Sequence, residues 1–274
     1  MSRKKIIYIF LSIILVLDLI LAGIIFSSHV DRLKIVFLDV GQGDSILISQ
    51  GKNQIIIDGG PSEKVELEKL GKYVPFWDRQ IEALIATHPD QDHIDGLVGV
   101  MKNYAVQAVV DNGMESDSKV YKNYIDVIKD KNIPRLTGTR GMKLKIGETV
   151  LEILYPSENS HPDSKDTNAG SIVAKLTRNK NSFLLTGDFP TKKDQEIFSS
   201  DLDLSAQVLK VAHHGSKYST SQEFLEKVNP EESIISVGAK NRYGHPAEEV
   251  ISRLRDAGIR IMRTDLEGDI EYDL

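Results

Sequence analysis

The chain has 274 residues, 34 lysines and arginines, 40 aspartates and glutamates and a formal net charge of −6. It contains no cysteine, which excludes disulfides, thiolate metal ligands and a cysteine nucleophile. The length is sufficient for one large domain with a full core, and the negative charge argues against a surface built for non-specific binding along a phosphate backbone.

Residues 6–26 are apolar apart from Ser12, Asp18 and Gly23, and they follow three basic residues at positions 3–5. A run of this length can cross a bilayer, and the preceding positive charge keeps the N-terminus in the cytoplasm. We therefore expect residues 1–30 to form a basic tail and a single transmembrane anchor in the cell membrane. Residues 31–274 then form an extracellular domain. The alternative is a cleaved signal peptide and a secreted protein.

Short runs of β-branched residues separated by glycine turns predict an N-terminal β-meander over residues 33–57. The elements expected next are a helix over 62–73, a strand over 83–86, a helix over 94–103, a strand over 105–110, a helix over 118–131 and a strand pair over 142–155.

The second half repeats this alternation of strands and helices. Strands are expected over 171–176, 182–185, 207–211, 233–237, 259–263 and 269–272, with helices over 191–199, 219–227 and 246–257. Many strands in each half, interrupted by helices, favour an α/β fold in which two mixed sheets pack together and helices cover them.

Residues 87–93 read Thr-His-Pro-Asp-Gln-Asp-His and directly follow the apolar run 83–86. Two imidazoles, His88 and His93, and two carboxylates, Asp90 and Asp92, therefore lie within six positions. Carboxylates brought this close repel one another unless a cation neutralises them. The segment predicts a divalent metal site, and two ions are expected.

Potential metal-ligating residues also occur at three further places, each at the end or the start of a predicted element. Asp188 comes just after the strand 182–185, His213 and His214 follow the strand 207–211, and His245 stands directly before the helix expected at Pro246. Each has a simpler explanation: Asp188 as a turn residue, His245 as a packed residue at a helix start. Their coincidence at strand ends favours one shared site.

These motifs resemble the metallo-β-lactamase superfamily and, within it, the nuclease-type domain of the ComEC-type competence proteins. The matching stretches are residues 37–45 (FLDVGQGDS), 58–60 (DGG), 88–96 (HPDQDHIDG), 186–188 (TGD), 213–216 (HHGS) and 241–246 (NRYGHP). The resemblance implies a metallo-β-lactamase-like four-layer αββα sandwich, here preceded by one N-terminal transmembrane helix, with two metal ions at one sheet edge.

The resemblance also implies a ligand set. One ion is held by His88 and Asp90 and the other by Asp92 and His93, with Asp188 bridging and His213 and His214 completing the two shells. The histidine usual between the loop and the bridging aspartate has no counterpart, because His161 lies in a polar loop; Asn168 is near that place. Since an oxygen ligand replaces an imidazole, manganese rivals zinc.

Asp39, Asp44 and Asp58 are candidates to orient the ligating histidines, although turn formation explains them equally well. A two-metal site activates water and stabilises the attacking and leaving oxygens of a displacement, which suits phosphodiester hydrolysis. The residues expected to act in catalysis are Asp92, Asp188, His245 and Asn168, with His245 donating a proton to the leaving group or a hydrogen bond to a phosphate oxygen.

The leading hypothesis is an exported, membrane-anchored, metal-dependent phosphodiesterase or nuclease with two zinc or manganese ions and a phosphodiester substrate such as DNA. One alternative is a cell-wall phosphodiesterase acting on the phosphorylcholine of teichoic acids. The other is a metal-stabilised envelope binding domain without catalysis.

Overall fold

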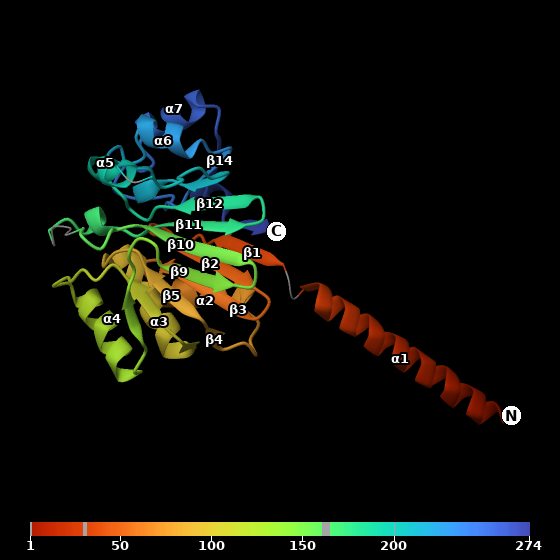
Figure 1. The fold of residues 1–274 in the computed structure, drawn as a ribbon. Coiled ribbons are helices and arrows are strands. Elements are labelled where there is room, and N and C mark those ends of the chain that lie inside the picture. Colours follow the sequence, from red (N-terminus) through yellow and green to blue (C-terminus); the bar gives the residue numbers. More distant parts are fainter. Residues whose placement is uncertain (1, 30–31, 161–164, 200) are drawn as a thin grey trace.

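The computed structural model describes residues 2–29, 32–160, 165–199 and 201–274. His161 lies outside these ranges. Two seven-stranded sheets pack face to face (Figure 1). The first has the order β16-β1-β2-β3-β5-β7-β8. Its strands are β1 (Leu33–Phe37), β2 (Ser45–Gln50), β3 (Asn53–Gly59), β5 (Ala83–Ala86), β7 (Val109–Asp111), β8 (Arg135–Thr137) and β16 (Ile270–Asp273). The antiparallel run β1-β2-β3 confirms the expected N-terminal meander.

The second sheet has the order β15-β14-β13-β12-β11-β10-β9. Its strands are β9 (Lys143–Ile146), β10 (Thr149–Tyr155), β11 (Val173–Arg178), β12 (Asn181–Leu185), β13 (Val208–Lys210), β14 (Glu232–Ile235) and β15 (Arg260–Arg263). A small separate ladder joins β4 (Gln80–Ile81) to β6 (Ala105–Val106).

Helices cover the outer face of each sheet (Figure 1). Over the first sheet lie α2 (Glu63–Tyr73), α3 (Gln91–Asn103) and α4 (Lys119–Asp130), and over the second lie α5 (Asp194–Phe198), α6 (Gln222–Val228) and α7 (Glu248–Asp256). Short turns of helix complete the chain: η1 (Thr167–Gly170), η2 (Thr191–Lys193), η3 (Ala212–Gly215) and α8 (Thr264–Glu267).

Three apolar layers hold the sandwich together. Ile55 and Ile57 of β3 face the core between the sheets, whereas Ile56 faces the helices α2–α4. Likewise Phe183 of β12 faces the inner core and Leu184 faces the helices on the other side. Because both faces of the central strands β3 and β5 are buried, these strands read as continuous apolar runs rather than alternating ones. The expected four-layer αββα arrangement is confirmed.

Several expected boundaries are wrong in ways that affect the site. Helix α3 begins at Gln91 rather than at residue 94, because Asp90 is its N-cap and brings Asp92 and His93 into the first helical turn. Helix α7 begins at Glu248 with Ala247 as its N-cap, so Pro246 is not a first-turn residue. Instead, the side chain of Asn241 ties the loop before α7 together through hydrogen bonds at Gly238 and His245.

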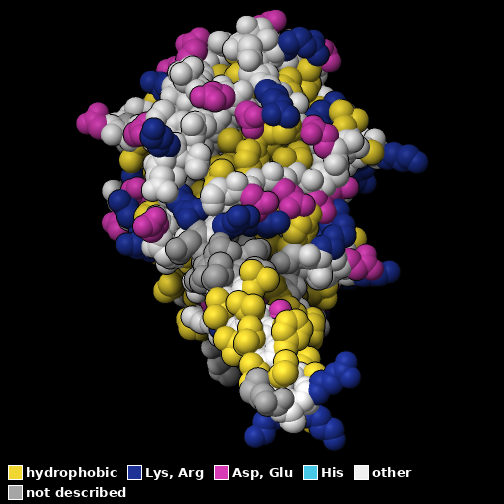
Figure 2. Space-filling model, turned by 90° about the vertical axis from the view of Figure 1, so that its right-hand side faces the viewer, with side chains coloured by type: hydrophobic (Ala, Val, Ile, Leu, Met, Phe, Trp, Pro, Cys, Tyr) yellow, Lys and Arg dark blue, Asp and Glu magenta, His cyan; other side chains and the backbone are white. Residues whose placement is uncertain are grey.

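Helix α1 (Arg3–His29) lies outside the two-sheet body. Its described side chains are exposed and mostly apolar, and Figure 2 shows basic side chains at its free end. Within the part of the chain that the structure describes, no helix is long and apolar enough to cross a membrane. The expected transmembrane anchor over residues 6–26 is therefore not supported. The expected localisation stays a prediction.

Candidate metal centre

The carboxyl ends of the central parallel strands of both sheets meet at one edge of the sandwich. Strand β5 ends at Ala86 and leads into the segment 87–93, while β12 and β13 end just before residues 186–188 and 211–216. A backbone hydrogen bond of 3.0 Å from Ile172 to the carbonyl of Thr87 joins the two sheets here. Such an edge aims side chains from distant segments into one crevice.

Asp188 lies at the centre of this edge and is buried. Its Oδ1 is 3.4 Å from Nε2 of His93. Its Oδ2 is 3.6 Å from Nε2 of His213, 3.7 Å from Nε2 of His214 and 4.0 Å from Nε2 of His88. The structure thus gathers four histidines, predicted from two separate segments, around a single carboxylate.

A left-handed backbone aims both histidines of η3 at this carboxylate. His213 has φ 52° and ψ 46°, and His214 has φ 53° and ψ 24°. For a residue other than glycine this conformation costs roughly 1–2 kcal/mol, so two in succession mark a segment held by its surroundings. The same turn brings Nε2 of His214 within 3.3 Å of Oδ2 of Asp92 in the first turn of α3.

Several buried ligand atoms at the centre have no hydrogen-bond partner among the described residues: Nε2 of His88, His93 and His214, and Oδ1 of Asp188. Leaving a buried polar atom unpaired costs about 1–3 kcal/mol. Ligand atoms converge within 4.8 Å in the groups His88–His93–Asp188, Asp92–His93–His214 and Asp44–Asp188–His214. Two ligands of one tetrahedral zinc ion stand about 3.4 Å apart, so the spacing and the donor types fit divalent metal ions.

Asp90 and His213 lie at the margin of the cluster. Oδ2 of Asp90 is 3.7 Å from Nε2 of His88, but its Oδ1 accepts a 2.6 Å hydrogen bond from Thr167 and its side chain is 39% exposed. The side chain of His213 is 28% exposed. Neither residue belongs to one of the compact groups, and the division of ligands between two ions stays a prediction.

A buried chain of hydrogen bonds orients the histidines of the first half. Oγ1 of Thr87 donates to Oδ2 of Asp58 over 2.7 Å and lies 3.0 Å from Nδ1 of His88. The same Oδ2 of Asp58 is 2.8 Å from Nδ1 of His93. If each Nδ1 donates its proton into this chain, both Nε2 lone pairs face Asp188, as metal ligation requires.

Asp44 plays the matching part in the second half, whereas Asp39 does not contact a histidine in any described interaction. Oδ1 of Asp44 is 3.3 Å from Nδ1 of His214, which also lies 2.9 Å from the carbonyl of Ser236. Asp39 accepts a hydrogen bond from Gly41, which is ordinary turn chemistry. Two of the three predicted orienting carboxylates thus lie beside a candidate ligand.

Sequence reasoning missed Thr87 and Lys210. The side chain of Lys210 is fully buried at the end of β13, with Nζ 2.8 Å from Oδ2 of Asp44 and 2.9 Å from the carbonyl of Val211. A lysine within an otherwise apolar strand was the available signal, because a buried ammonium needs a paired carboxylate. Its contact links the strand β13 to the loop before β2.

The charges at the centre shift the pKa values of its members in opposite directions. Burial lowers the pKa of His214, but Asp188 and Asp44 outweigh it and raise the value to about 10. Burial would raise the pKa of Asp188, yet His214 and His93 hold it well below its usual range. A metal ion that binds Nε2 of His214 therefore competes with a proton for this atom, which makes the affinity for metal rise with pH.

His245 and Asn168 border the cluster from its open side. The ring of His245 is 5.6 Å from that of His213 and stacks 5.9 Å from that of Tyr243. Nδ2 of Asn168 is 3.3 Å from Nδ1 of His213. Burial, and then the charges of His213 and His214, lower the pKa of His245. Neither residue belongs to one of the groups of converging ligand atoms among the described residues.

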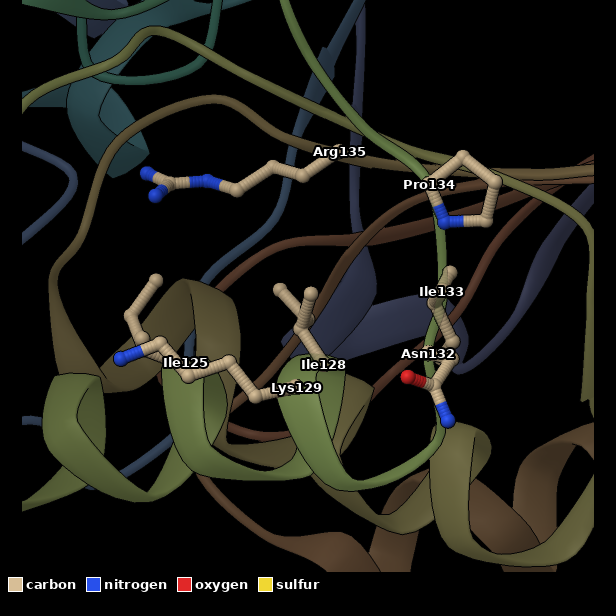
Figure 3. Close-up of a pocket in the computed structure, with 7 residues that line it drawn as sticks. All are labelled: Ile125, Ile128, Lys129, Asn132, Ile133, Pro134 and Arg135. Carbon is tan, nitrogen blue, oxygen red and sulfur yellow. The ribbon is translucent and has the colours of Figure 1, made fainter.

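A cavity of about 480 Å³ opens beside His213 and Asn168. Its other lining residues are Asp166, Pro190, Thr191, Lys192, Lys217 and Tyr218. A larger cavity of about 580 Å³ lies elsewhere, between α4 and residues 132–135 (Figure 3). No histidine lines this larger cavity, and its Arg135 already pairs with Asp111 at 2.6 Å. The cavity beside His213 is therefore the candidate site for substrate.

Residues 38–239 match the metallo-beta-lactamase superfamily. The chain belongs to this superfamily. Its members share the two-sheet fold and the metal-binding edge described above, so the clustered histidines and aspartates of this metallo-β-lactamase domain are candidate metal ligands.

Relatives with competence-protein names agree with the ComEC-type resemblance. ComE operon protein 3 of Bacillus subtilis (strain 168) is 34% identical, over 87% of this chain and 33% of that protein. Competence protein ComA of Neisseria gonorrhoeae is 28% identical, over 86% of this chain and 31% of that protein. The chain thus spans about a third of the length of these curated relatives.

Among solved structures, the metallo-β-lactamase fold protein YhfI of Bacillus subtilis superposes with a TM-score of 0.58 at 13% identity. The match covers 88% of this chain and 100% of YhfI. At this identity the likeness concerns the fold alone. It agrees with the four-layer arrangement of the metallo-β-lactamase domain.

Proposed function

We propose that this chain is a metal-dependent phosphodiesterase of the ComEC type, which cleaves a phosphodiester such as DNA with the help of two divalent ions. The observation that carries the proposal is the position of Asp188. It lies within 4.0 Å of four histidine rings, and the buried atoms Oδ1 of Asp188 and Nε2 of His88, His93 and His214 have no hydrogen-bond partner among the described residues. The names of the competence-protein relatives support a nucleic-acid or other phosphodiester substrate.

In such a site, bound ions would lower the pKa of a water molecule and stabilise the charge on the attacking and leaving oxygens. Other side chains of this protein hold the candidate histidine ligands in position. Asp58 and Thr87 fix His88 and His93, and Asp44 fixes His214. Asp92 and Asp188 in the cluster and Asp90 at its margin supply hard oxygen donors, so Mn²⁺ is a candidate beside Zn²⁺.

His245 and Asn168 then meet the substrate from the open side. The pKa of His245 is lowered, first by burial and then by His213 and His214. A neutral imidazole donates a hydrogen bond well but is a poor reservoir of protons. We therefore favour His245 as a hydrogen-bond donor to a phosphate oxygen over the alternative role of general acid.

The test is turnover by the purified chain with Mn²⁺ and Zn²⁺ in turn. The substrates are a labelled single strand of DNA, the matching duplex, bis(p-nitrophenyl) phosphate and a choline phosphodiester. We expect metal-dependent cleavage of at least one nucleic acid by the wild type. Asp188→Asn keeps the shape of the side chain but removes its charge, so it should fold normally and lose activity.

Two results would contradict the proposal. One is a folded, metal-loaded wild type that cleaves only the choline phosphodiester, which would favour the cell-wall enzyme. The other is a wild type that binds metal and cleaves none of the substrates, which would favour a binding domain without catalysis.

A further inference from the structure

Two exposed tyrosines, each preceded by a basic residue, adjoin the candidate metal centre. Tyr218 is 67% exposed and Tyr243 is 56% exposed. Nζ of Lys217 lies 5.1 Å from the ring centre of Tyr218, and Cζ of Arg242 lies 5.3 Å from the ring centre of Tyr243. We call Lys217–Tyr218 and Arg242–Tyr243 the two cation–tyrosine pairs.

The first pair forms part of the cavity beside the metal centre. Lys217 and Tyr218 line it together with His213. Lys192, another lysine of this cavity, already forms an ion pair with Asp166. Within the described part of the chain Lys217 has no acidic partner, so its charge remains available to an anionic ligand.

The second pair is connected to His213 by the ring of His245, which lies between them. The ring of Tyr243 stacks on that of His245 at 5.9 Å with an interplanar angle of 17°, and His245 is 5.6 Å from His213. A planar group that replaced or extended this stack would lie directly beside the metal centre.

The backbone beneath both tyrosines is held in place. The amide of Thr191 donates to the carbonyl of Tyr218 over 2.9 Å. The amides of Tyr243 and His245 both donate to Oδ1 of Asn241, over 3.2 and 3.0 Å. The rings are therefore exposed but presented from fixed positions, which reduces the ordering cost of binding.

We propose that the two cation–tyrosine pairs bind unpaired nucleobases next to the scissile phosphodiester, which makes single-stranded nucleic acid the preferred substrate class. This inference rests on the proposed phosphodiesterase function. Aromatic rings stack on any base, while the adjacent lysine and arginine attract the backbone phosphates. Bases within a duplex are already stacked on one another and cannot reach the rings.

The same pairs weigh against a choline substrate. Quaternary ammonium groups are bound by aromatic faces that are free of other cations. Here a basic group lies within about 5 Å of each ring centre, at 5.1 and 5.3 Å, and would repel a second cation. A neutral base on an anionic backbone suits both members of each pair.

The experiment compares Tyr218→Ala and Tyr243→Ala with Tyr218→Phe and Tyr243→Phe, which keep the ring. Phe76→Ala removes an exposed aromatic ring from the segment between α2 and β4 and serves as the control for lost exposed surface. The ligands are a fluorescent single strand, a strand of equal length with abasic positions, and the duplex. KM is measured with Mn²⁺, and Kd by anisotropy in the Asp188→Asn background.

We expect each alanine variant to raise KM and Kd for the normal strand roughly 5- to 100-fold, as stacking contributions imply, and to leave both values for the abasic strand unchanged. The phenylalanine variants and Phe76→Ala should match the wild type. Two results would overturn the inference if the wild type still cleaves DNA. In one, the alanine variants bind normal and abasic strands equally weakly; in the other, they bind both as tightly as the wild type does. Absence of cleavage of every phosphodiester by the wild type would instead overturn the proposed function, and the anisotropy series would still report on base recognition.

Discussion

His245 stands apart from the candidate ligands even though its ring is 5.6 Å from that of His213. We predict that His245→Ala retains the metal content of the wild type while turnover of DNA falls by roughly 10²–10³-fold, the cost of losing one hydrogen-bond donor in the transition state, whereas His214→Ala loses metal. Metal content by mass spectrometry separates the two variants. Loss of metal from His245→Ala would make this residue a ligand.

A phosphodiester with a good leaving group distinguishes the two possible roles of His245, general acid and hydrogen-bond donor to a phosphate oxygen. A nitrophenolate departs without protonation, so a general acid would matter much less for bis(p-nitrophenyl) phosphate than for DNA. Equal losses on both substrates would show that His245 holds the phosphate, which is the role that its lowered pKa favours.

Lys210 and Asp44 form an ion pair whose side chains are 0% and 2% exposed. Lys210→Met leaves the carboxylate buried beside His214 without its partner, and we predict a loss of about 3–5 kcal/mol in the free energy of unfolding. The double variant Lys210→Met with Asp44→Asn should recover part of this loss. Urea denaturation measures both.

The exposed pair Lys64–Glu68 supplies the control, because Lys64→Met should change the free energy of unfolding by less than about 1 kcal/mol. A Lys210→Met variant as stable as this control would show that the buried pair contributes nothing.

Glu66 is buried and accepts a 3.0 Å hydrogen bond from Ser45, and burial raises its pKa from 4.5 to about 8. Between these values the unfolded chain has released the proton that the folded chain keeps. The contribution of Glu66 to the free energy of unfolding therefore falls by a few kcal/mol as pH rises from about 4.5 to 8.

Glu66→Gln removes this dependence, so we predict that the variant is less sensitive than the wild type across that range and more stable at pH 8. The exposed Glu68→Gln should follow the wild type. Parallel stability curves for wild type and Glu66→Gln would mean that Glu66 titrates normally in the fold.

At the scale of elements, helix α3 approaches strand β3 through glycines. A Cβ added at Gly96 would lie 1.7 Å from the carbonyl oxygen of Gly59, so this helix cannot keep its position with any other residue there. The first turn of α3 carries Asp92 and His93. We predict that Gly96→Ala lowers both the free energy of unfolding and the metal content, because the helix must move outward.

Gly71 in α2 provides a matched control, since nothing lies within 4 Å of an added Cβ. Gly71→Ala should stabilise the protein by up to about 1 kcal/mol through helix propensity alone. Thermal melts with metal analysis test the pair. A Gly96→Ala variant with full metal content would show that α3 does not position the ligands.

Element types were predictable from the sequence, while the contacts between them were not. The motif at 87–93 identified the candidate ligands because their chemical types cluster locally. Thr87 and Lys210 were missed, since their importance arises from Asp58 and Asp44, which lie far away in the chain. The starts of α3 and α7 were misplaced because the backbone carbonyl of Asp90 already accepts the first hydrogen bonds of α3, from His93 and Ile94, and because Asn241 ties the loop before α7 together.

At the scale of the molecule, the candidate ligands come from both sheets. His88 and His93 follow β5 of the first sheet, whereas Asp188 and His214 follow β12 and β13 of the second. Ions held here stabilise only the assembled sandwich, by about 2.7 kcal/mol when the free metal is 100 times its Kd. We predict that a chelator lowers the melting temperature of the whole domain in one cooperative transition.

Calorimetry with and without chelator, and with metal restored, provides the measurement. The same experiment on Asp188→Asn should show little effect of chelator, because the site is already impaired. A chelator effect confined to one of two separate transitions would mean that the sheets unfold independently.

The junction of the two sheets has a consequence for a chain without cysteine. His88 and His214 are 126 positions apart, and an ion held between their segments closes a loop of that length much as a covalent cross-link would. In the chain-entropy description, a cross-link over about 100 residues contributes about 4–5 kcal/mol by restricting the unfolded chain. Reduction of a covalent bond plays no part in opening this cross-link, whereas acid opens it because protons compete for the same ring nitrogens. The durability of the domain therefore depends on the supply of metal.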